Sequence, residues 1–297
     1  MNATRAQASV SGARRRFHWS SLRAPVCWIV ALLYFLPIYW MVKTSIQPDN
    51  QITITQVNLG LTAVTLQHYL KILGDVQFLR WFLNSTIYAV STMVIAVLVS
   101  TLAAYSLARQ RFWFAQAMGR PFLAAYIVPG VMIVVPIFVM MAGFSWQNTY
   151  QSLIITYTSF SVPFCTWLLR AYFRSLPAEL EDAALVDGCS RLGALFRIIF
   201  PLAAPGVVTA GLFCFILAWN EYLFAFVFLF SNDMKTLSVA LQSVLSNQLA
   251  ASGASLGYYS FGEMFAMTVL TALPIIVVFL LLQNWLVRGL AAGAVKG

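Results

Sequence analysis

The stretch PAELEDAALVDGCSRLGALFRIIFPLAAP, residues 177–205, places four acidic residues within a chain that is otherwise strongly apolar. Ser175 and Pro177 precede three of these acids, and an N-cap hydroxyl, an early proline and acids in the first turn all favour the start of a helix. Gly188 then supplies a residue that tolerates the left-handed conformation in which helices often end. The stretch predicts a short helix over residues 177–187.

A second short helix is predicted to begin near Ser190. Its apolar residues recur at the i, i+3, i+4 and i+7 spacing that gives a helix one apolar stripe. They are Leu192, Leu195, Phe196 and Ile199. Two short helices at an angle, the first tipped with acids, predict a protrusion that a cytoplasmic partner protein binds in a groove.

The composition indicates that the rest of the chain lies in a membrane. Hydrophobic residues make up 61% of the chain and charged residues 9%, with a mean hydropathy of +0.80, whereas soluble domains carry about 25% charged residues. A helix that crosses the bilayer needs roughly 20 mostly apolar residues. Six runs meet this requirement: residues 25–42, 84–108, 121–144, 151–169, 200–230 and 264–287. The sequence predicts an all-α membrane protein with six spans. The first turns of the fifth span, near Pro201 and Pro205, are expected to be either interfacial or bent.

The distribution of Lys and Arg predicts the orientation, because cytoplasmic loops carry the excess of these residues. If the N-terminus is inside, 14 of the 18 basic residues lie in cytoplasmic segments and 4 lie outside. We therefore expect both termini to be cytoplasmic, together with the loop over residues 171–200. Residues 1–24 are expected to form a disordered tail, and residues 25–297 a six-helix membrane domain. In the second half of the long outside loop, residues 43–83, the stretch that begins at Thr65 is expected to form a helix along the membrane interface, either as a brace for the helix that follows or as a docking surface for an external partner.

The net charge of +9 is explained by this topology, with an attraction to anionic membrane lipid as a consequence. Nucleic-acid binding is not expected, because no soluble module carries a basic face. The four cysteines form no CxxC pair, and His68 has no neighbouring metal ligand, so neither a disulfide framework nor a metal site is predicted.

The stretch around Asp182 resembles the EAA loop of the inner-membrane subunits of ABC importers. That pattern is Glu-Ala-Ala, three residues, Gly, nine residues and Ile-x-Leu-Pro, and here it falls on Asp182, Ala183, Ala184, Gly188, Ile198 and Pro201. The acid of the motif is Asp182 rather than Glu, with Glu181 directly before it. In the family this acid pairs with the ATP-hydrolysing subunit, so the sequence leaves open whether Glu181 or Asp182 makes that contact.

Other segments are similar to the carbohydrate-importing branch of this family, in the subunit type of the second membrane subunit of the maltose transporter. They are LNSTIYAVSTMVIAVLVSTLAAYSLAR, AWNEYLFAF and RGLAAGAVKG. The resemblance implies a six-helix core of the type I importers and a permease function in sugar uptake. It also implies three kinds of partner: a sister membrane subunit, a pair of ABC ATPase subunits and an extracytoplasmic sugar-binding protein.

The chain itself is not expected to be an enzyme. It has no Gly-x4-Gly-Lys-Ser/Thr phosphate-binding loop, so ATP and Mg²⁺ are expected on the partner ATPase subunits and no cofactor on this chain. Movement of the acid-tipped helix, driven by the ATPases, would reach the gates through the fourth and fifth spans.

The candidate substrate path lies in the fifth span, at Trp219, Asn220, Glu221 and Tyr222. A carboxylate within the membrane is costly and faces the helix bundle or a water-filled cavity. Glu221 is expected to accept hydroxyl hydrogen bonds from a sugar, with Trp219 and Tyr222 against the sugar ring, or else to hydrogen-bond the sister subunit at a gate. A structural role in a buried pair is a third explanation.

A secondary transporter or channel is the alternative class of protein. Such a protein also has kinked helices and a membrane-embedded acid, but internal repeats or further intramembrane charges are expected in it. A membrane-bound enzyme would need a catalytic constellation, and the chain shows none at suitable spacing. Binding of ATPase subunits discriminates an ATP-driven importer from both alternatives.

Overall fold

The computed structural model describes residues 19–52, 60, 63–109, 129–251 and 259–294, and within these ranges all regular structure is helical. The first half contains α1 (Trp19–Ser45), a 3-10 turn η1 (Asp49–Gln51), α2 (Gln67–Gly74), α3 (Val76–Arg109) and α6 (Gly130–Gly143). The second half contains α7 (Tyr150–Ser175), α8 (Glu179–Val186), α9 (Arg191–Ala194), a π-helical segment η2 (Leu195–Ile199), α10 (Phe200–Leu202), α11 (Ala204–Asn220), α12 (Leu223–Phe228), a 3-10 turn η3 (Asn232–Met234), α13 (Leu237–Ala251) and α14 (Phe261–Ala294).

The long helices agree with most of the predicted spans. α1, α3, α7 and α14 are each long and apolar enough to cross a membrane. The fifth span is bent, which is one of its two expected arrangements, because the helical run Arg191–Leu202 meets α11 at 82°. The third predicted span is described only over its second part, as the short helix α6, since residues 110–128 lie outside the described ranges. The six-span count is therefore matched by four long helices, one bent helix pair and one short apolar helix.

The boundary of the second span differs from the prediction. Residues 76–83 were expected to lie along the interface, but they are the first turns of the continuous helix α3. Asp75 explains where α3 begins, because its carboxylate oxygen Oδ1 accepts a 2.8 Å hydrogen bond from the backbone N–H of Gln77. Residues 76–83 are thus helical as expected, but they continue directly into the second span, and only α2 is a separate short helix.

The centre of the molecule is formed by α3, α7 and α11, which pack against one another. Small and hydroxyl-bearing residues on the buried face of α3 allow this close packing; they are Ala89, Thr92, Ala96, Ser100, Thr101 and Ala104. On α11, Gly206 lies directly against the ring of Tyr172 in α7, where a Cβ atom would be 2.5 Å from the ring. The small side chains bring the three helix backbones together without a large aliphatic layer between them.

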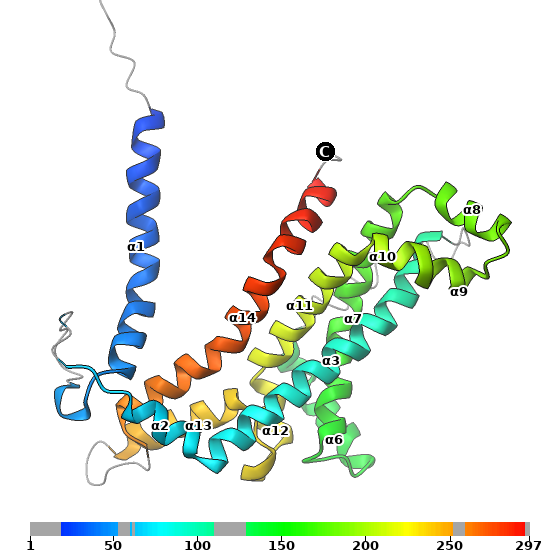
Figure 1. Cartoon of the computed structure of the whole chain (residues 1–297). Coiled ribbons are helices and arrows are strands. Elements are labelled where there is room, and N and C mark those ends of the chain that lie inside the picture. The colour runs from blue at the N-terminus through cyan, green and yellow to red at the C-terminus, as the bar shows by residue number, and fades with distance from the viewer. Residues whose placement is uncertain (1–18, 53–59, 61–62, 110–128, 252–258, 295–297) are drawn as a thin grey trace, which may run out of the picture.

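Much of the remaining surface is apolar. Along α1 the exposed side chains include Val26, Trp28, Ile29, Leu32, Leu33 and Tyr34, and along α14 they include Ile276, Val277, Phe279, Leu280 and Leu281. Helices that are apolar on the outside are suited to hydrocarbon or to another membrane subunit rather than to water. α1 contacts α14 near one end and diverges from it toward its own N-terminus (Figure 1).

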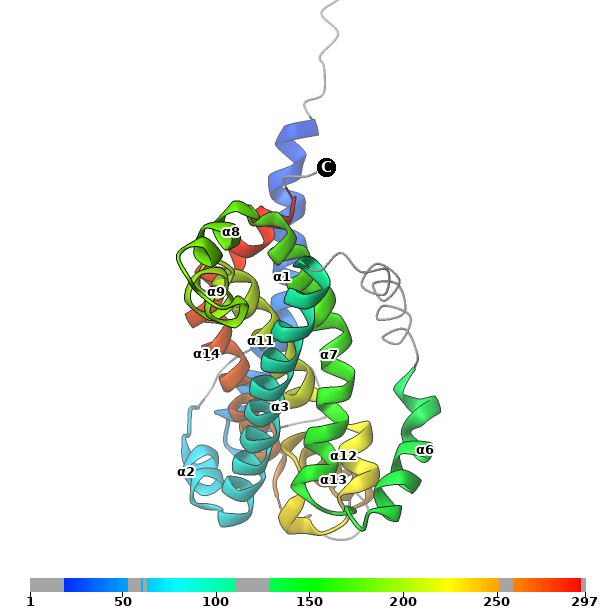
Figure 2. The same ribbon diagram turned by 90° about the vertical axis from the view of Figure 1, so that its right-hand side faces the viewer.

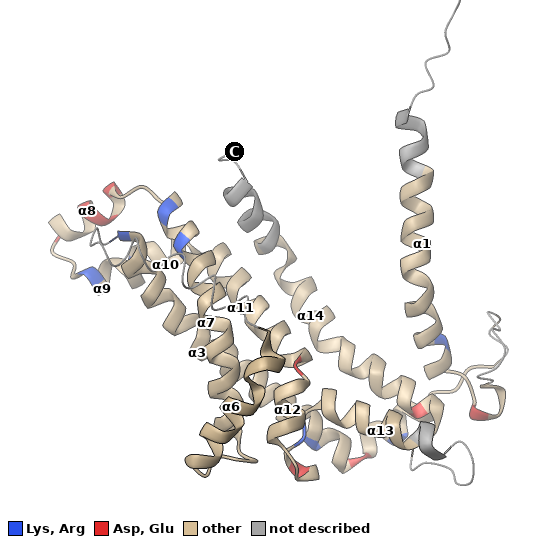
Figure 3. Cartoon of the chain, turned by 180° about the vertical axis from the view of Figure 1, so that it is seen from behind, with Lys and Arg blue, Asp and Glu red and all other residues tan. Residues whose placement is uncertain are grey.

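The two ends of the helices carry different elements. α8 and α9 lie at the same end as the N-terminus of α1 and the C-terminus of α14, whereas α2, α13 and the far end of α6 lie at the opposite end (Figures 1 and 2). We call these the α8 end and the α2 end. Charged residues lie mostly near the two ends, and the long helices between them are largely uncharged (Figure 3). This distribution fits a chain whose middle lies in a bilayer.

Candidate functional site

The acid-tipped helix predicted from the sequence is α8, at the α8 end of the molecule. It begins two residues later than predicted, because Ser175 does not cap it. The Ser175 hydroxyl instead donates a 2.7 Å hydrogen bond to the carbonyl of Tyr172 in the last turn of α7, and Ala178 occupies the N-cap position of α8. The end of α8 is as predicted: Gly188 has a φ of +83°, and the N–H of Cys189 donates to the carbonyl of Ala184 at 2.9 Å.

The second predicted helix is confirmed, but its apolar stripe is only half correct. Ser190 caps α9, since its hydroxyl oxygen accepts a 3.1 Å hydrogen bond from the N–H of Gly193. Leu195 and Ile199 are fully buried, whereas Leu192 and Phe196 are 59% and 48% exposed. The π-helical segment η2 explains the difference, because its wider turn changes which positions share a face with those of the preceding α-helical turn.

Glu181 points into the protein. Its residue is 7% exposed, and its carboxylate receives a 2.5 Å hydrogen bond on Oε1 from the hydroxyl of Tyr105 in α3. The guanidinium Nε of Arg109, the last residue of α3, lies 3.2 Å from Oε2. Arg109 also donates from Nη2 to the carbonyl of Leu176, at 3.2 Å. Glu181 is thus held by an ion pair and a charge-assisted hydrogen bond within its own chain.

Asp182 points in a different direction. It is exposed, as is the neighbouring Ala183, while Ala184 is buried against the rest of the molecule. Val186, one turn beyond Asp182, is 87% exposed, and Leu180, on the side of α8 that carries Ala184, is 37% exposed. The two acids that the sequence left as alternatives therefore lie on different faces of α8, about 100° apart. Of these two, only Asp182 is exposed.

Glu221 lies at the break between α11 and α12. Its two carboxylate oxygens accept hydrogen bonds from the backbone N–H groups of Phe224 and Ala225, at 3.0 and 3.2 Å, and the hydroxyl of Tyr157 donates to Oε2 at 2.7 Å. A carboxylate in this position accepts hydrogen bonds from free N–H groups at the start of a helix. Its negative charge also interacts favourably with the positive end of the helix dipole. The arrangement gives Glu221 a capping function and ties the break to α7.

The other three residues of the candidate path have different surroundings. Trp219 is 2% exposed; its ring stacks on Phe215 with centroids 5.5 Å apart, and its Nε1 donates to the carbonyl of Thr271 at 3.2 Å. Asn220 and Tyr222 are exposed. The structure thus places Trp219 in the core of this chain, where its faces are covered, and leaves Asn220 and Tyr222 at the surface beside the helix break.

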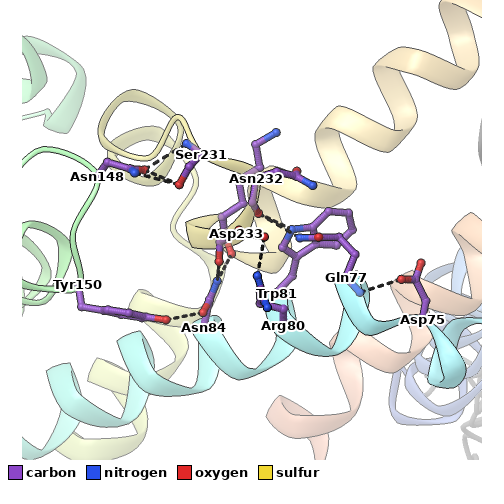
Figure 4. Close-up of polar contacts among 11 residues, drawn as sticks. Asp75, Gln77, Arg80, Trp81, Asn84, Asn148, Tyr150, Ser231, Asn232 and Asp233 are labelled. Carbon is purple, nitrogen blue, oxygen red and sulfur yellow. Dashed lines mark hydrogen bonds and ion pairs between the residues drawn. The ribbon is translucent and has the colours of Figure 1, made fainter.

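The sequence did not indicate a polar cluster at the α2 end, centred on Asn84. This residue is 1% exposed, and its amide donates to the carbonyls of Asp233 and Lys235 at 2.7 and 3.0 Å. Its Oδ1 accepts a 2.6 Å hydrogen bond from the hydroxyl of Tyr150 (Figure 4). Asn84 therefore joins α3 and α7 to the loop between α12 and α13, residues 229–236, which we call the 229–236 loop.

Further side chains form hydrogen bonds or an ion pair with the 229–236 loop (Figure 4). From α3, the indole N–H of Trp81 donates to the carbonyl of Asn232 at 2.9 Å, and Arg80 pairs with Asp233 at 2.7 Å. Asn148 accepts on Oδ1 from the backbone N–H groups of Phe230 and Ser231. The polar residues of α3 recur on one face near its start, and that spacing is the signal by which the sequence would have revealed the cluster.

No grouping of three or more His, Cys, Asp or Glu side chains suited to a metal ion occurs in the part of the chain that the structure describes. The ring of His68 is buried and lies 3.0 Å, through Nε2, from the carbonyl of Gln47. This contact joins α2, which contains His68, to the segment that follows α1, and it gives the imidazole a structural role.

A multi-pass helical membrane protein with a bent span and a protruding acidic helix at one end is the architecture of a transport permease. The chain belongs to the family described as "Binding-protein-dependent transport system inner membrane component", whose model matches residues 96–292. The members of this family are the membrane subunits of ABC importers, so the chain is a permease subunit and not an ATPase. Family membership also decides against the secondary transporter and the channel.

Several relatives match nearly the whole chain. The inner membrane ABC transporter permease protein YcjP of Escherichia coli is 34% identical, over 90% of this chain and 92% of the relative. The sulfoquinovosyl glycerol transport system permease protein SmoH of Agrobacterium fabrum is 32% identical, over 98% and 99% of the two chains. The trehalose/maltose transport system permease protein MalG of Thermococcus litoralis is 32% identical, over 91% and 94%.

A solved structure has the same fold. It is a bacterial ABC transporter involved in the import of the acidic polysaccharide alginate, with a TM-score of 0.77 and 26% identity, over 90% of this chain and 96% of the other. The predicted membrane fold, the importer family and the location in an inner membrane are thereby confirmed.

Proposed function

We propose that this chain is the permease subunit of an ATP-driven importer of a sugar, an oligosaccharide or a sugar derivative. Two of the relatives named above support the carbohydrate class, because their names assign them to the transport of sulfoquinovosyl glycerol and of trehalose and maltose. The geometry of α8 is the observation that supports coupling of this chain to an ATPase. This helix presents Asp182 outward at the end of the molecule, within a motif that matches the ATPase-binding loop of this family.

In this proposal α8 is the coupling helix. Asp182 pairs with a basic residue of the ATPase, while the exposed Leu180 and Val186 supply apolar contact at the edge of a groove. Ala183 keeps the outward face narrow, and Gly188 ends the helix so that the chain turns into α9. Glu181 belongs to the permease side of this junction, because Arg109 and Tyr105 already occupy its carboxylate.

The proposed assembly contains one sister permease subunit, two ABC ATPase subunits and an extracytoplasmic sugar-binding protein. ATP and Mg²⁺ bind to the ATPase pair, and this chain carries no cofactor. The α8 end faces the cytoplasm and the α2 end faces the binding protein, with both termini cytoplasmic. The excess of Lys and Arg in the predicted cytoplasmic segments supports this orientation.

The proposed contribution of this chain to the substrate path is the surface beside the α11–α12 break. Asn220 and Tyr222 are exposed there, and the Tyr222 ring stacks on Phe226 with centroids 5.4 Å apart. An amide and a flat aromatic surface suit the hydroxyls and the apolar face of a sugar ring. In this proposal Glu221 shapes the path by fixing the break rather than by touching the sugar.

Affinity purification of the tagged chain from native membranes in mild detergent tests the proposal. We expect an ATPase and a second permease to co-purify, and the preparation to hydrolyse ATP. Asp182→Lys should lose the ATPase, because it places a positive charge where the partner's basic residue binds. Asp187→Lys is the matched control, since Asp187 is also an exposed acid of the loop. A chain that purifies alone, or an ATPase retained by Asp182→Lys, contradicts the proposed coupling.

A further inference from the structure

We propose that α3 connects the coupling helix to the 229–236 loop at the opposite face of the membrane, and that Glu181 and Asn84 are the positioning residues at its two ends. The inference rests on the proposed function, because it concerns how a movement at the α8 end is transmitted to the α2 end. It assigns the connection to a helix that is remote from α8 in the sequence, whereas the sequence alone pointed to the two spans that flank the loop.

The contact of α3 with the coupling helix is ionic and largely buried. Side chains of Arg109 and Glu181 have exposed fractions of only 13% and 10%, and Tyr105 holds the second oxygen of the same carboxylate. Breaking one partner of such a pair leaves a buried charge without compensation. Movement of α8 therefore moves the end of α3 with it rather than sliding past it.

The opposite end of α3 makes an equally specific contact. Asn84 uses both of its N–H groups on the carbonyls of Asp233 and Lys235, and the hydroxyl of Ser85 accepts a 2.8 Å hydrogen bond from the N–H of Leu237. These bonds go to the backbone of the 229–236 loop and the first residue of α13, so they fix the path of the chain there. Asn232 and Asp233 remain exposed on this loop.

The helix between these contacts is suited to carry a displacement. α3 is continuous over 34 residues, which corresponds to about 50 Å at the rise of an α-helix. It contains neither proline nor glycine, whereas α1, α6, α7 and α14 each contain a proline within the helix. Kinks arise mainly at such residues, so α3 is the long described helix best able to move as one body.

The connection has a functional consequence for the surface that faces the binding protein. When the ATPases close, α8 shifts, α3 follows through Arg109 and Tyr105, and the exposed residues of the 229–236 loop change position. The external partner thereby meets a different surface in the ATP-bound complex than in the nucleotide-free complex. The affinity of the binding protein would depend on the nucleotide state, and the dependence would be reciprocal.

Hydrogen exchange at the 229–236 loop tests this inference. The complex of this chain with its co-purifying subunits is placed in lipid nanodiscs, and exchange is measured without nucleotide and with ATP, Mg²⁺ and vanadate. We expect the wild-type loop to change its exchange rate by about fivefold or more between the two states. Glu181→Gln and Arg109→Gln should keep the ATPase bound but lose most of that change. Asp187→Asn, an exposed acid near the same helix, should retain it.

Tyr105→Phe keeps the test valid if the charge variants fold poorly, because it removes one hydroxyl and leaves the ion pair. We expect it to reduce the nucleotide-dependent change while the loop without nucleotide exchanges as in the wild type. The inference would be overturned if the exchange rate of the loop in Glu181→Gln or Tyr105→Phe changed with nucleotide as much as in the wild type. It would also be overturned if the exchange rate of the wild-type loop did not change with nucleotide. Either result with an active, ATPase-bound complex contradicts only the link through α3, whereas an ATPase retained by Asp182→Lys contradicts the proposed docking site.

Discussion

Tyr105 of α3 donates a 2.5 Å hydrogen bond to Glu181 of α8, although the two residues are 76 positions apart in the chain. This bond holds Glu181 of α8 against the membrane domain, whereas Asp182, on a different face of α8, is exposed and is the acid that we propose pairs with the ATPase. Sequence spacing alone leaves these acids equivalent, because both lie in the first half of one short helix.

The Tyr105 hydroxyl is expected to stabilise the folded permease. Tyr105→Phe removes a donor from a buried carboxylate, which should cost about 1–3 kcal/mol. The melting temperature of the detergent-solubilised chain, followed by tryptophan fluorescence, would show the loss. Tyr172→Phe is the matched control, because no hydrogen bond of that hydroxyl occurs within the described residues. Equal melting temperatures for the two variants would count against the role assigned to Tyr105.

Asn84 is expected to control the mobility of the 229–236 loop. Asn84→Leu leaves two backbone carbonyls and the Tyr150 hydroxyl without their partner. In a background without the native cysteines, a cysteine introduced by Thr236→Cys, at a position of this loop that is 2% exposed, should then react with a water-soluble maleimide about tenfold faster, since each buried group left unpaired costs about 1–3 kcal/mol. Gln77→Ala, which removes one exposed 3.2 Å bond to the same loop, should change the rate little. Similar rates in both variants would contradict the prediction.

Gly206 is expected to tolerate no larger residue. In Gly206→Ala the new Cβ would lie 2.5 Å from the ring of Tyr172, so α11 must move away from α7 at a cost of about 1–3 kcal/mol. The yield of folded protein and its melting temperature should fall, and a second change, Tyr172→Ala, should restore both. Gly143→Ala serves as the control, because nothing lies within 4 Å of the corresponding Cβ. Failure of the double variant to recover would show that the contact with Tyr172 is not the limiting one.

The capping role of Glu221 predicts separate effects on stability and on substrate affinity. Glu221→Ala removes the acceptor for Phe224, Ala225 and Tyr157, so the folded complex should lose stability while the KM for the transported sugar stays within about twofold. Tyr222→Ala should do the reverse, because Tyr222 is exposed and caps nothing. Transport assays in proteoliposomes, together with melting curves, measure both quantities. A large rise in KM with an unchanged melting temperature for Glu221→Ala would assign Glu221 to sugar binding.

Much of the fold could be predicted because the bilayer imposes strong rules on the sequence. Long uncharged runs identified the spans corresponding to α1, α3, α7 and α14, and the prolines near residue 201 indicated the bent fifth span. Local chemistry was a mixed guide. Gly188 adopts positive φ and α9 begins directly after Ser190, as expected, whereas the expected cap from Ser175 is absent.

The remaining features depend on contacts between segments that are distant in the sequence. The partner of Glu181 lies on α3, and the carbonyls held by Asn84 follow α12. The spacing of polar residues on α3 indicates that this face makes polar contacts, but it does not indicate which distant segment they reach. Trp219 was interpreted as a surface for sugar, but its neighbours Phe215 and Thr271 cover it. Leu192 and Phe196 are exposed because the π-helical segment η2 changes which positions share a face of the helix. The prediction assumed a regular α-helix with about 3.6 residues per turn.

The pairing of Arg109 with Glu181 also sets an order for biogenesis. Arg109 is synthesised before Glu181, so α3 enters the membrane while the guanidinium still lacks its carboxylate. In the proposed orientation, the positive charge would help during that interval to retain this end of α3 on the cytoplasmic side. Once α8 emerges from the ribosome, the same charge becomes half of a buried ion pair. One arginine thus serves first as a signal for membrane insertion and later as a part of the finished structure.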